Sequence, residues 1–455
     1  MEHGNSALFS HKLHPSFYDE LFDNLSAVCY HYSNLKNKEA AVLKRISKQS
    51  IVLLSIFALC IVLNLLARFC TPFADWYTYY IYHPLADFGS RLSGLIPFSF
   101  GIFLPILGIL LLVLGIPALI VALIRTKDKE KRRTIRRTVG FFLAWAFAYV
   151  TLTETLHCFI MYQQTTLGER EYATLEATPD ELLDAYEQVV IHLEELEPQI
   201  TRTAMGYVKY SGTEEELEAE AVRAMQGLSD WDSRFSGYYP PVKYFLFPEF
   251  FRYDGTIGLF TPYTLEANVM PDLSYNEMAV VRCHELAHLK GIILEDEANF
   301  IAFRACVESD SVFLQYSGYV SALRYLHHAI ITYFNRIIET LEADPTYYDE
   351  AFQIHFSEWS ERFNDLDFRA EAAYQDAWNY YRFDAETAEE LEEEQTEYDD
   401  TVLSDETIEV IEDVSDTLTD TSLKINGVSD GMQSYNRMVD LTIQYLKEAA
   451  PADKP

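Results

Sequence analysis

Long apolar runs alternate with short basic segments in the first third of the chain. The first run, 49–67, carries no charged residue, and the second, 92–124, is uncharged throughout. A third run begins at Val139 and continues to about Phe159. Because about 20 apolar residues cross a hydrocarbon core of about 30 Å, this pattern predicts three transmembrane helices, the second of them near 101–124.

Basic residues indicate how these spans are oriented. Five Lys and Arg residues lie between Lys36 and Lys48, directly before the first run, and eight lie in 125–137, between the second and the third. Since Lys and Arg concentrate in cytoplasmic loops, both segments are expected on the cytoplasmic side of a membrane. We therefore predict a cytoplasmic segment over 1–48, a three-span anchor over 49–162, and an extracytoplasmic location for everything that follows. The first span is expected to be an uncleaved anchor, since no small-residue cleavage site accompanies it.

After the third run the pattern changes to the shorter periods of a globular domain, which we place at 163–450. Alternating apolar residues predict two short strands around a turn over 255–270. The aromatic and Pro-rich stretch 238–251 is expected to be irregular, and the acidic stretch 386–420 to be either a mobile insertion or a solvated helix face. Helical spacing predicts helices over 178–200, 213–229, 320–342, 346–383 and after Ser434. The expected fold is mainly α, with an α+β domain after three N-terminal transmembrane helices.

One further predicted helix carries a catalytic pattern. Residues 284–288 read His-Glu-Leu-Ala-His, which is the HExxH pattern of zinc peptidases. Residues four apart share one helix face, so the imidazoles of His284 and His288 can bind one Zn²⁺. Glu285 lies one step around the helix, where its carboxylate can reach a metal-bound water without binding the metal.

The HExxH helix is clearly delimited, and a second helix follows it closely. Ser274 with Glu277 three residues later predicts a capping box at its start, and Gly291 predicts its C-terminal end. The residues from Glu295 to Val307 predict the second helix, with its first carboxylates facing back to the histidines. The alternative is a pair of solvated helices in which the HExxH pattern is accidental.

A third metal ligand is expected at the start of this second helix. Glu295 is the first choice and Glu297 the reserve, whereas Asp296 points about 100° away from Glu295. A metzincin-type third ligand would fall at Leu294, which cannot bind a metal. Asn299, four residues after Glu295, is expected to accept an imidazole N–H and so to orient a metal-bound histidine.

The two predicted strands directly precede the HExxH helix, and two roles are open for them. In zinc peptidases an edge strand above the metal pairs with the substrate backbone. Phe260, Thr261 and Tyr263 are the candidates for that contact with substrate. The alternative is a purely structural hairpin.

Charge and cysteine content narrow the choice of partners and of metal site. Residues 1–160 hold 16 basic and 10 acidic side chains, whereas 161–455 hold 19 and 60, a net charge of −41. So acidic a domain repels nucleic acid, which we do not expect as a partner. Cys283 and Cys306 lie one on each metal-site helix and are expected either to pair or to stay buried as free thiols. No CxxC pattern indicates a cysteine-based zinc site.

Several short motifs along the chain form a combination typical of one family. They are Pro97-Phe98-Ser99-Phe100-Gly101, 258–264, Glu266-Ala267-Asn268, 284–288, 295–300, Tyr316-Ser317-Gly318-Tyr319, Asn426-Gly427-Val428 and Ser434-Tyr435-x-Arg437. In these motifs the chain, over about 50–450, resembles domain-of-unknown-function family 3810, a group of membrane-anchored bacterial proteins predicted to be gluzincin-like zinc metallopeptidases. The resemblance implies a zincin-like domain outside a three-span anchor in a bacterial cell membrane. It implies no particular substrate.

The predicted reaction is zinc-assisted hydrolysis of a peptide bond in a peptide or protein substrate. His284, His288 and Glu295 are expected to hold the ion, and Glu285 to act as the general base. Residue type and family resemblance suggest three further groups that can stabilise the tetrahedral oxyanion. These are Tyr316, Tyr435 and Arg437.

Two other functions stay open at the level of sequence. The outer domain can be a zinc-stabilised sensor or assembly module without proteolytic activity, although such a module has no need of Glu285. Glu154 and His157, near the outer end of the third span, can belong to an ion path, although polar groups at an interface are more often solvated. The sequence does not indicate an oligomeric state.

Overall fold

The computed structural model describes residues 48–171, 177–252, 255–385, 387, 390–391 and 436–449. It divides into two compact units, Met1–Leu59 and Cys60–Pro455, and all that follows on packing concerns the second. The described part is mainly helical, as predicted. Most of the acidic stretch 386–420 lies outside the described residues, so its predicted mobility stays a prediction.

Among the described residues, three helical segments are long and apolar enough to cross a membrane, which is the number of spans expected from the sequence. They are α2 (Lys48–Phe69), α5 (Phe100–Arg125) and the continuous segment Lys129–Gln163. The third segment is α6 (Lys129–Glu154) followed by a π-helical turn, η2 (Thr155–Phe159), and a 3-10 turn, η3 (Met161–Gln163).

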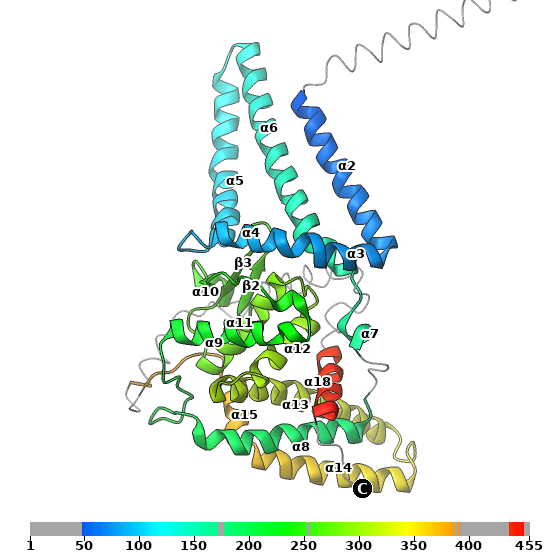
Figure 1. The fold of residues 1–455 in the computed structure, drawn as a ribbon. Helices are drawn as coiled ribbons and strands as arrows, with labels where there is room; N and C mark the ends of the chain where they lie inside the picture. Colours follow the sequence, from blue (N-terminus) through cyan, green and yellow to red (C-terminus); the bar gives the residue numbers. More distant parts are fainter. Residues whose placement is uncertain are drawn as a thin grey trace, which may run out of the picture. The chain divides into compact units, whose positions relative to one another are not determined.

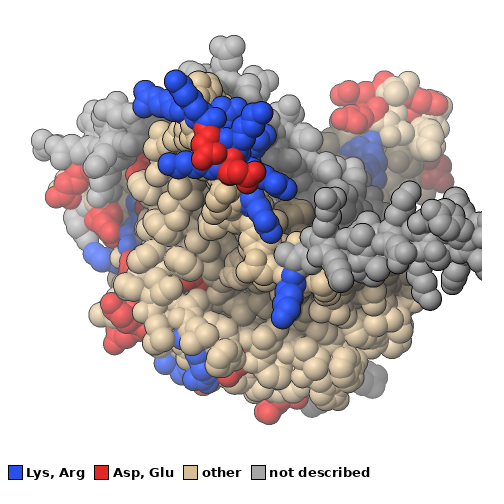
Figure 2. Space-filling view, turned by 90° about the horizontal axis from the view of Figure 1, so that it is seen from above, with Lys and Arg blue, Asp and Glu red and all other residues tan. Residues whose placement is uncertain are grey.

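The connection between α5 and α6 carries the densest group of basic side chains. Figure 2 views the molecule from this end and shows Lys and Arg gathered over it. The residues are Arg125, Lys127, Lys129, Lys131, Arg132, Arg133, Arg136 and Arg137. Asp128 begins α6 as an N-cap, accepting hydrogen bonds from the backbone N–H groups of Glu130 and Lys131.

A helical segment joins α2 to α5 at the opposite end of the spans, and it consists of α3 (Thr71–Tyr77), η1 (Thr78–Tyr82) and α4 (His83–Ser93) (Figure 1). Helix α4 is amphipathic: Ala86 and Ser90 are buried, whereas Phe88 and Leu92 are 63% and 54% exposed. Helix α4 therefore has one side packed on the protein and an apolar side that is exposed.

A small sheet lies close to α4, with strand order β1-β3-β2. Strands β2 (Gly258–Thr261) and β3 (Glu266–Val269) pair antiparallel, as the alternating pattern over 255–270 predicted. Strand β1 (Lys243–Tyr244) pairs parallel to β3 and lies in the stretch that we expected to be irregular. Among the described residues, β2 is an edge strand whose outer side pairs with no other strand.

Helices α11 (Tyr275–Leu289), α12 (Glu295–Val307) and α13 (Val312–Ala343) pack against one another and form the centre of the outer domain (Figure 1). Nearly every residue of α11 is buried, because β3 and α9 cover its other sides. The remaining helices are α7 (Leu167–Glu171), α8 (Pro179–Leu196), α9 (Glu214–Gly227), α10 (Pro248–Arg252), α14 (Glu350–Arg369), α15 (Glu371–Trp378) and α18 (Asn436–Ala449).

The predicted helices are present, and two boundaries differ. Helix α13 begins at Val312 rather than near 320, so the Tyr316–Tyr319 motif lies inside it. Within that motif Gly318 allows close packing, because a Cβ there would lie 2.8 Å from the Cβ of Cys306 on α12. The predicted helix 346–383 is two helices, α14 and α15, which meet at Ala370.

Candidate metal centre

Helix α11 begins and ends where the sequence indicated, but the contacts at its start differ. Ser274 is the N-cap residue, yet its side chain makes no capping hydrogen bond, so the predicted capping box is wrong. Glu277 instead forms a bidentate ion pair with Arg324 of α13, at 2.9 and 3.2 Å. At the other end, Gly291 has φ +90°, the left-handed conformation that ends a helix and that glycine adopts without strain.

The turn at Gly291 brings the start of α12 back over the face of α11 that carries His284 and His288. The two carboxylate oxygens of Glu295 lie 3.1 Å from Nε2 of His284 and 3.4 Å from Nε2 of His288. The carboxylate of Glu285 lies 4.0 Å from the same His284 nitrogen. His284, Glu285 and His288 each offer an atom that can bind a metal, and these atoms lie within 4.8 Å of one another. The four residues thus form one cluster.

The His288 ring is oriented by a backbone group. Its Nδ1 lies 2.7 Å from the carbonyl oxygen of Ile292, which can only accept a hydrogen bond, so Nδ1 carries the proton and Nε2 faces Glu295. Asn299, which we expected to accept an imidazole N–H, lines the cavity beside the cluster. In the described part of the chain it makes no hydrogen bond to either ring, so its role stays a prediction.

Burial and charge shift the protonation of the cluster strongly. Burial raises the pKa of the Glu285 carboxyl to about 7, against the opposing effect of the two histidines. Burial lowers the pKa of His288, but the Glu295 carboxylate outweighs it and raises the value to about 9. Burial alone would raise the pKa of Glu295, but its contacts with His288 and His284 outweigh burial and hold that pKa far below its usual range. Oε2 of Glu285 is buried and has no hydrogen-bond partner.

The cluster lies at the wall of a cavity of about 610 Å³, with a smaller one of about 170 Å³ beside it. Strand β2 contributes Gly258 and Leu259 to both cavities. Gly258 lies so close to the cluster that a Cβ there would be 2.2 Å from Oε1 of Glu285. Only glycine fits at this point without displacing the carboxylate or the strand.

Of the three strand residues expected to face a substrate, only Phe260 lines the cavity. Its ring centroid lies 6.2 Å from that of His288. The Thr261 hydroxyl is buried against Thr264, and the Tyr263 hydroxyl donates a hydrogen bond to the carbonyl of Gly101. These two side chains therefore hold the hairpin in place rather than reach into the cavity.

Two of the three residues expected to stabilise an oxyanion lie away from the two cavities. Tyr316 is fully buried, and its hydroxyl donates to Asp376, which also pairs with Arg202. Arg437 donates to Asp296 at 2.6 Å and lines neither of the two cavities. Tyr435 lies outside the described residues.

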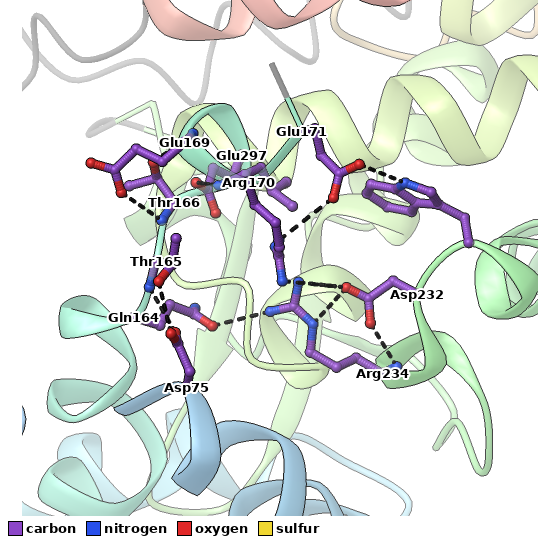
Figure 3. A network of polar contacts seen from close by, with 12 residues as sticks. Asp75, Gln164, Thr165, Thr166, Glu169, Arg170, Glu171, Asp232, Arg234 and Glu297 are labelled. Atoms are coloured by element: carbon purple, nitrogen blue, oxygen red, sulfur yellow. Dashed lines mark hydrogen bonds and ion pairs between the residues drawn. The ribbon is translucent and has the colours of Figure 1, made fainter. Parts of the chain in front are cut away.

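Glu297, the reserve ligand, faces away from the histidines. Its carboxylate accepts a hydrogen bond from the backbone N–H of Leu167 at 2.5 Å, and burial raises its pKa to about 7. Figure 3 shows this carboxylate in a polar network with Arg234 and Asp75, which contact the segment that follows the third span. Glu295 is thus the carboxylate of α12 that reaches the histidines.

Helix α13 adds polar residues to the cavity that the sequence analysis did not identify. Arg324, Tyr325 and Ser321 line the larger cavity together with His284 and Glu285. The sequence signal for this part of the site was Arg324, a single arginine between apolar residues of a long helix. Its partner, Glu277, lies 47 residues away in sequence, so the pairing was not visible as a local pattern. The cysteines of α11 and α12 are buried free thiols, with 3.9 Å between the sulfurs of Cys283 and Cys306.

Comparison with known proteins gives one match, which is to a protein family. No curated protein and no solved structure matches the chain. One family, described as "Protein of unknown function (DUF3810)", matches residues 77–346, which cover η1, α4, α5, α6, the sheet, α11, α12 and α13. Since this match extends over more than half of the 455 residues, the chain belongs to the family DUF3810.

Proposed function

We propose that this protein is a membrane-anchored zinc metallopeptidase with a zincin-like outer domain. The observation that supports this best is the meeting of two imidazoles and one carboxylate from two helices, with Glu285 beside them. A structural ion pair would not need the second acid, which is buried, lacks a hydrogen-bond partner at Oε2 and lines the cavity.

The donor set suits zinc. Ligand atoms about 2.0–2.1 Å from a tetrahedral zinc lie about 3.3 Å from one another. Glu295 approaches the two histidines to 3.1 and 3.4 Å, each through a different carboxylate oxygen, so its carboxylate lies within reach of an ion held by both imidazoles. His284, His288 and Glu295 would therefore hold the ion, and the Ile292 carbonyl would keep Nε2 of His288 turned toward it.

Each remaining group has a task in hydrolysis. When bound, zinc would lower the pKa of a water molecule and polarise the scissile carbonyl. Glu285 would take a proton from that water and pass it to the leaving amine, a role for which a raised pKa is suited. For the oxyanion, the structure favours Arg324 and Tyr325, which line the cavity, over Tyr316 and Arg437, which do not.

We also propose that the catalytic domain lies outside the cytoplasm. The basic α5–α6 connection is at the end of the two spans opposite to α4, and basic loops remain on the cytoplasmic side. The domain is continuous with the other end of the spans, through η3 and α7. This gives a cytoplasmic N-terminus for a three-span protein of a bacterial cell membrane.

Two substitutions test the proposal in the purified full chain. Glu285→Gln should keep one zinc per chain and abolish cleavage of a mixed-sequence peptide library, whereas Glu295→Ala should lose the zinc. The control is Glu342→Gln, an exposed change near the end of α13 that should alter neither. Cleavage by Glu285→Gln at the parental rate would refute the mechanism. Stoichiometric zinc without any cleavage by the parent would favour the sensor or assembly module.

A further inference from the structure

The last turns of the third span form part of the wall of the candidate active site. Cys158 lies in η2 and Tyr162 in η3, and both line the smaller cavity with His284, His288 and Glu295. Tyr162 also lines the larger cavity. Both residues belong to the segment Lys129–Gln163 that is long and apolar enough to cross a membrane. No intervening layer of protein separates this membrane helix from the metal-ligand cluster.

The hairpin that borders the cavity is fastened to two membrane helices. From the third span, His157 Nδ1 lies 2.6 Å from the Pro262 carbonyl oxygen, and the Tyr149 hydroxyl donates to the Tyr263 carbonyl at 2.6 Å. At the start of α5, Gly101 approaches the hairpin so closely that a Cβ would lie 2.3 Å from Oγ1 of Thr261. The position of β2 beside the cluster is therefore set by the spans.

The metal-site helices are held to the same end of the spans. The Tyr82 hydroxyl, between α3 and α4, donates to the Leu289 carbonyl at the end of α11. After the third span, Gln164 donates to the Gly291 carbonyl, and the N–H of Leu167 donates to Glu297 of α12. Figure 3 shows Gln164 hydrogen-bonded to Arg234 and Thr165 hydrogen-bonded to Asp75, with Glu297 close by.

The exposed side of α4 indicates where the bilayer surface lies. Its buried side packs on the hairpin, since a Cβ at Gly89 would lie 2.4 Å from Leu265. Phe88 and Leu92 on α4 and Leu95 just after it are 63%, 54% and 80% exposed. An amphipathic helix of this kind lies in the headgroup region with its apolar side toward the acyl chains. The hairpin on its other side, and the cavity bordered by that hairpin, then lie directly above the headgroups.

From these contacts we infer that the substrates are themselves membrane-anchored, and that cleavage occurs within the first few residues of a polypeptide emerging from a transmembrane helix. This inference rests on the proposed peptidase function and adds the substrate class. The emerging segment would enter past Tyr162 and extend along the free edge of β2, which offers unpaired backbone groups to an added strand. A substrate confined to the same bilayer also meets the site at a much higher effective concentration than a free peptide.

Reporter substrates of three kinds test the inference, all carrying the same randomised eight-residue segment before a fluorescent domain. In the first, about three residues separate this segment from a transmembrane helix, a reach of at most roughly 10 Å. In the second, a flexible spacer of about 25 residues has an r.m.s. reach of roughly 28 Å. The third has no membrane helix. Each is incubated in lipid vesicles with the zinc-loaded full chain or with Glu285→Gln.

The inference predicts that the short-spacer substrate is cut at least about tenfold faster than the free one, and only by the parent. Equal rates for the free and anchored substrates, or cleavage restricted to the long spacer, would overturn the inference and leave the peptidase function standing. Absence of Glu285-dependent cleavage from all three kinds would overturn the proposed function, and the inference with it.

A second variant tests the role of α4 directly. Phe88→Asp combined with Leu92→Asp places two charges on its exposed face, away from the catalytic groups. Cleavage of the short-spacer substrate should fall at least about fivefold, because the helix can no longer settle into the headgroup region. Ile191→Asp, at an apolar position on α8 that is 40% exposed, is the control and should leave the rate unchanged. Equal rates for both variants would contradict the placement of the cavity at the bilayer surface.

Discussion

The close approach of β2 to the candidate general base makes Gly258→Ala a sensitive probe. The added Cβ would lie 2.2 Å from Oε1 of Glu285, 2.8 Å from Cγ1 of Val281 and 2.9 Å from Cδ of Glu285. Ordinary van der Waals contact begins near 3.4 Å, so the carboxylate or the strand must move by about 1.2 Å. Glu285 is buried on α11 and faces Gly258 of β2 directly, so a displaced carboxylate can move only toward the neighbouring cavities.

The expected result is a loss of rate without a loss of metal. A displacement of about 1 Å in a catalytic group can lower the rate about 100-fold. Overpacking of this kind destabilises a fold by about 1–3 kcal/mol, which leaves the protein folded. Hydrolysis and zinc content are measured on the same preparation, with Gly227→Ala as the control because a Cβ there meets nothing within 4 Å. Parental activity in Gly258→Ala would refute the role of Glu285, and loss of zinc would show that the strand positions the ligands instead.

Three further predictions follow from contacts around the site. Tyr316→Phe removes two hydrogen bonds, one that the hydroxyl donates to Asp376 and one that it accepts from Arg202, while the Arg202–Asp376 pair remains. Thermal unfolding should therefore show a loss of about 1–3 kcal/mol and hydrolysis should be unchanged; a large fall in rate would make Tyr316 a catalytic group. Lys243→Met leaves the buried Glu266 carboxylate without its cation and should lower the free energy of unfolding by about 3–5 kcal/mol. Adding Glu266→Gln to the same chain should restore most of that stability. If the losses from the two substitutions add instead, the pairing is contradicted. Burial alone would raise the pKa of Asp232, but the ion pair with Arg234 outweighs burial and holds the pKa below its usual 3.8. The pair therefore stabilises the fold above that pH, and this contribution is lost as the pH falls toward the lowered pKa. The destabilisation by Asp232→Asn should shrink in acid, and a destabilisation that does not change with pH would refute this reasoning.

Local spacing was sufficient to predict the spans, the β2–β3 hairpin and the cluster of α11 and α12. Four-residue spacing puts His284 and His288 on one face, and the left-handed Gly291 turns the chain back so that Glu295 meets them. The hairpin and the cluster each depend on fewer than about fifteen consecutive residues, and the spans on about 20 apolar ones, so a sequence pattern contains that information.

Features that depend on distant partners were missed or misassigned. Glu277 has the position of a capping-box residue but pairs with Arg324 across the core, since a buried bidentate pair outweighs a local cap. Tyr316 belongs to a family motif, yet its hydroxyl is held by Asp376, 60 residues away. The parallel strand β1 has only two residues, too few for any alternation to be visible.

The contact between Glu266 and α5 has a consequence for how the protein is made. The first backbone N–H groups of a helix have no acceptor within it. In α5, Glu266 accepts from the N–H of Gly101 at 2.5 Å and from that of Phe100 at 3.4 Å. A ribosome adds Gly101, at the start of α5, 165 residues before it reaches this glutamate. Insertion of the spans into the bilayer must therefore precede the folding step that closes their outer end, and chains halted between the two steps should show an intact anchor beneath an unfolded, protease-sensitive outer domain.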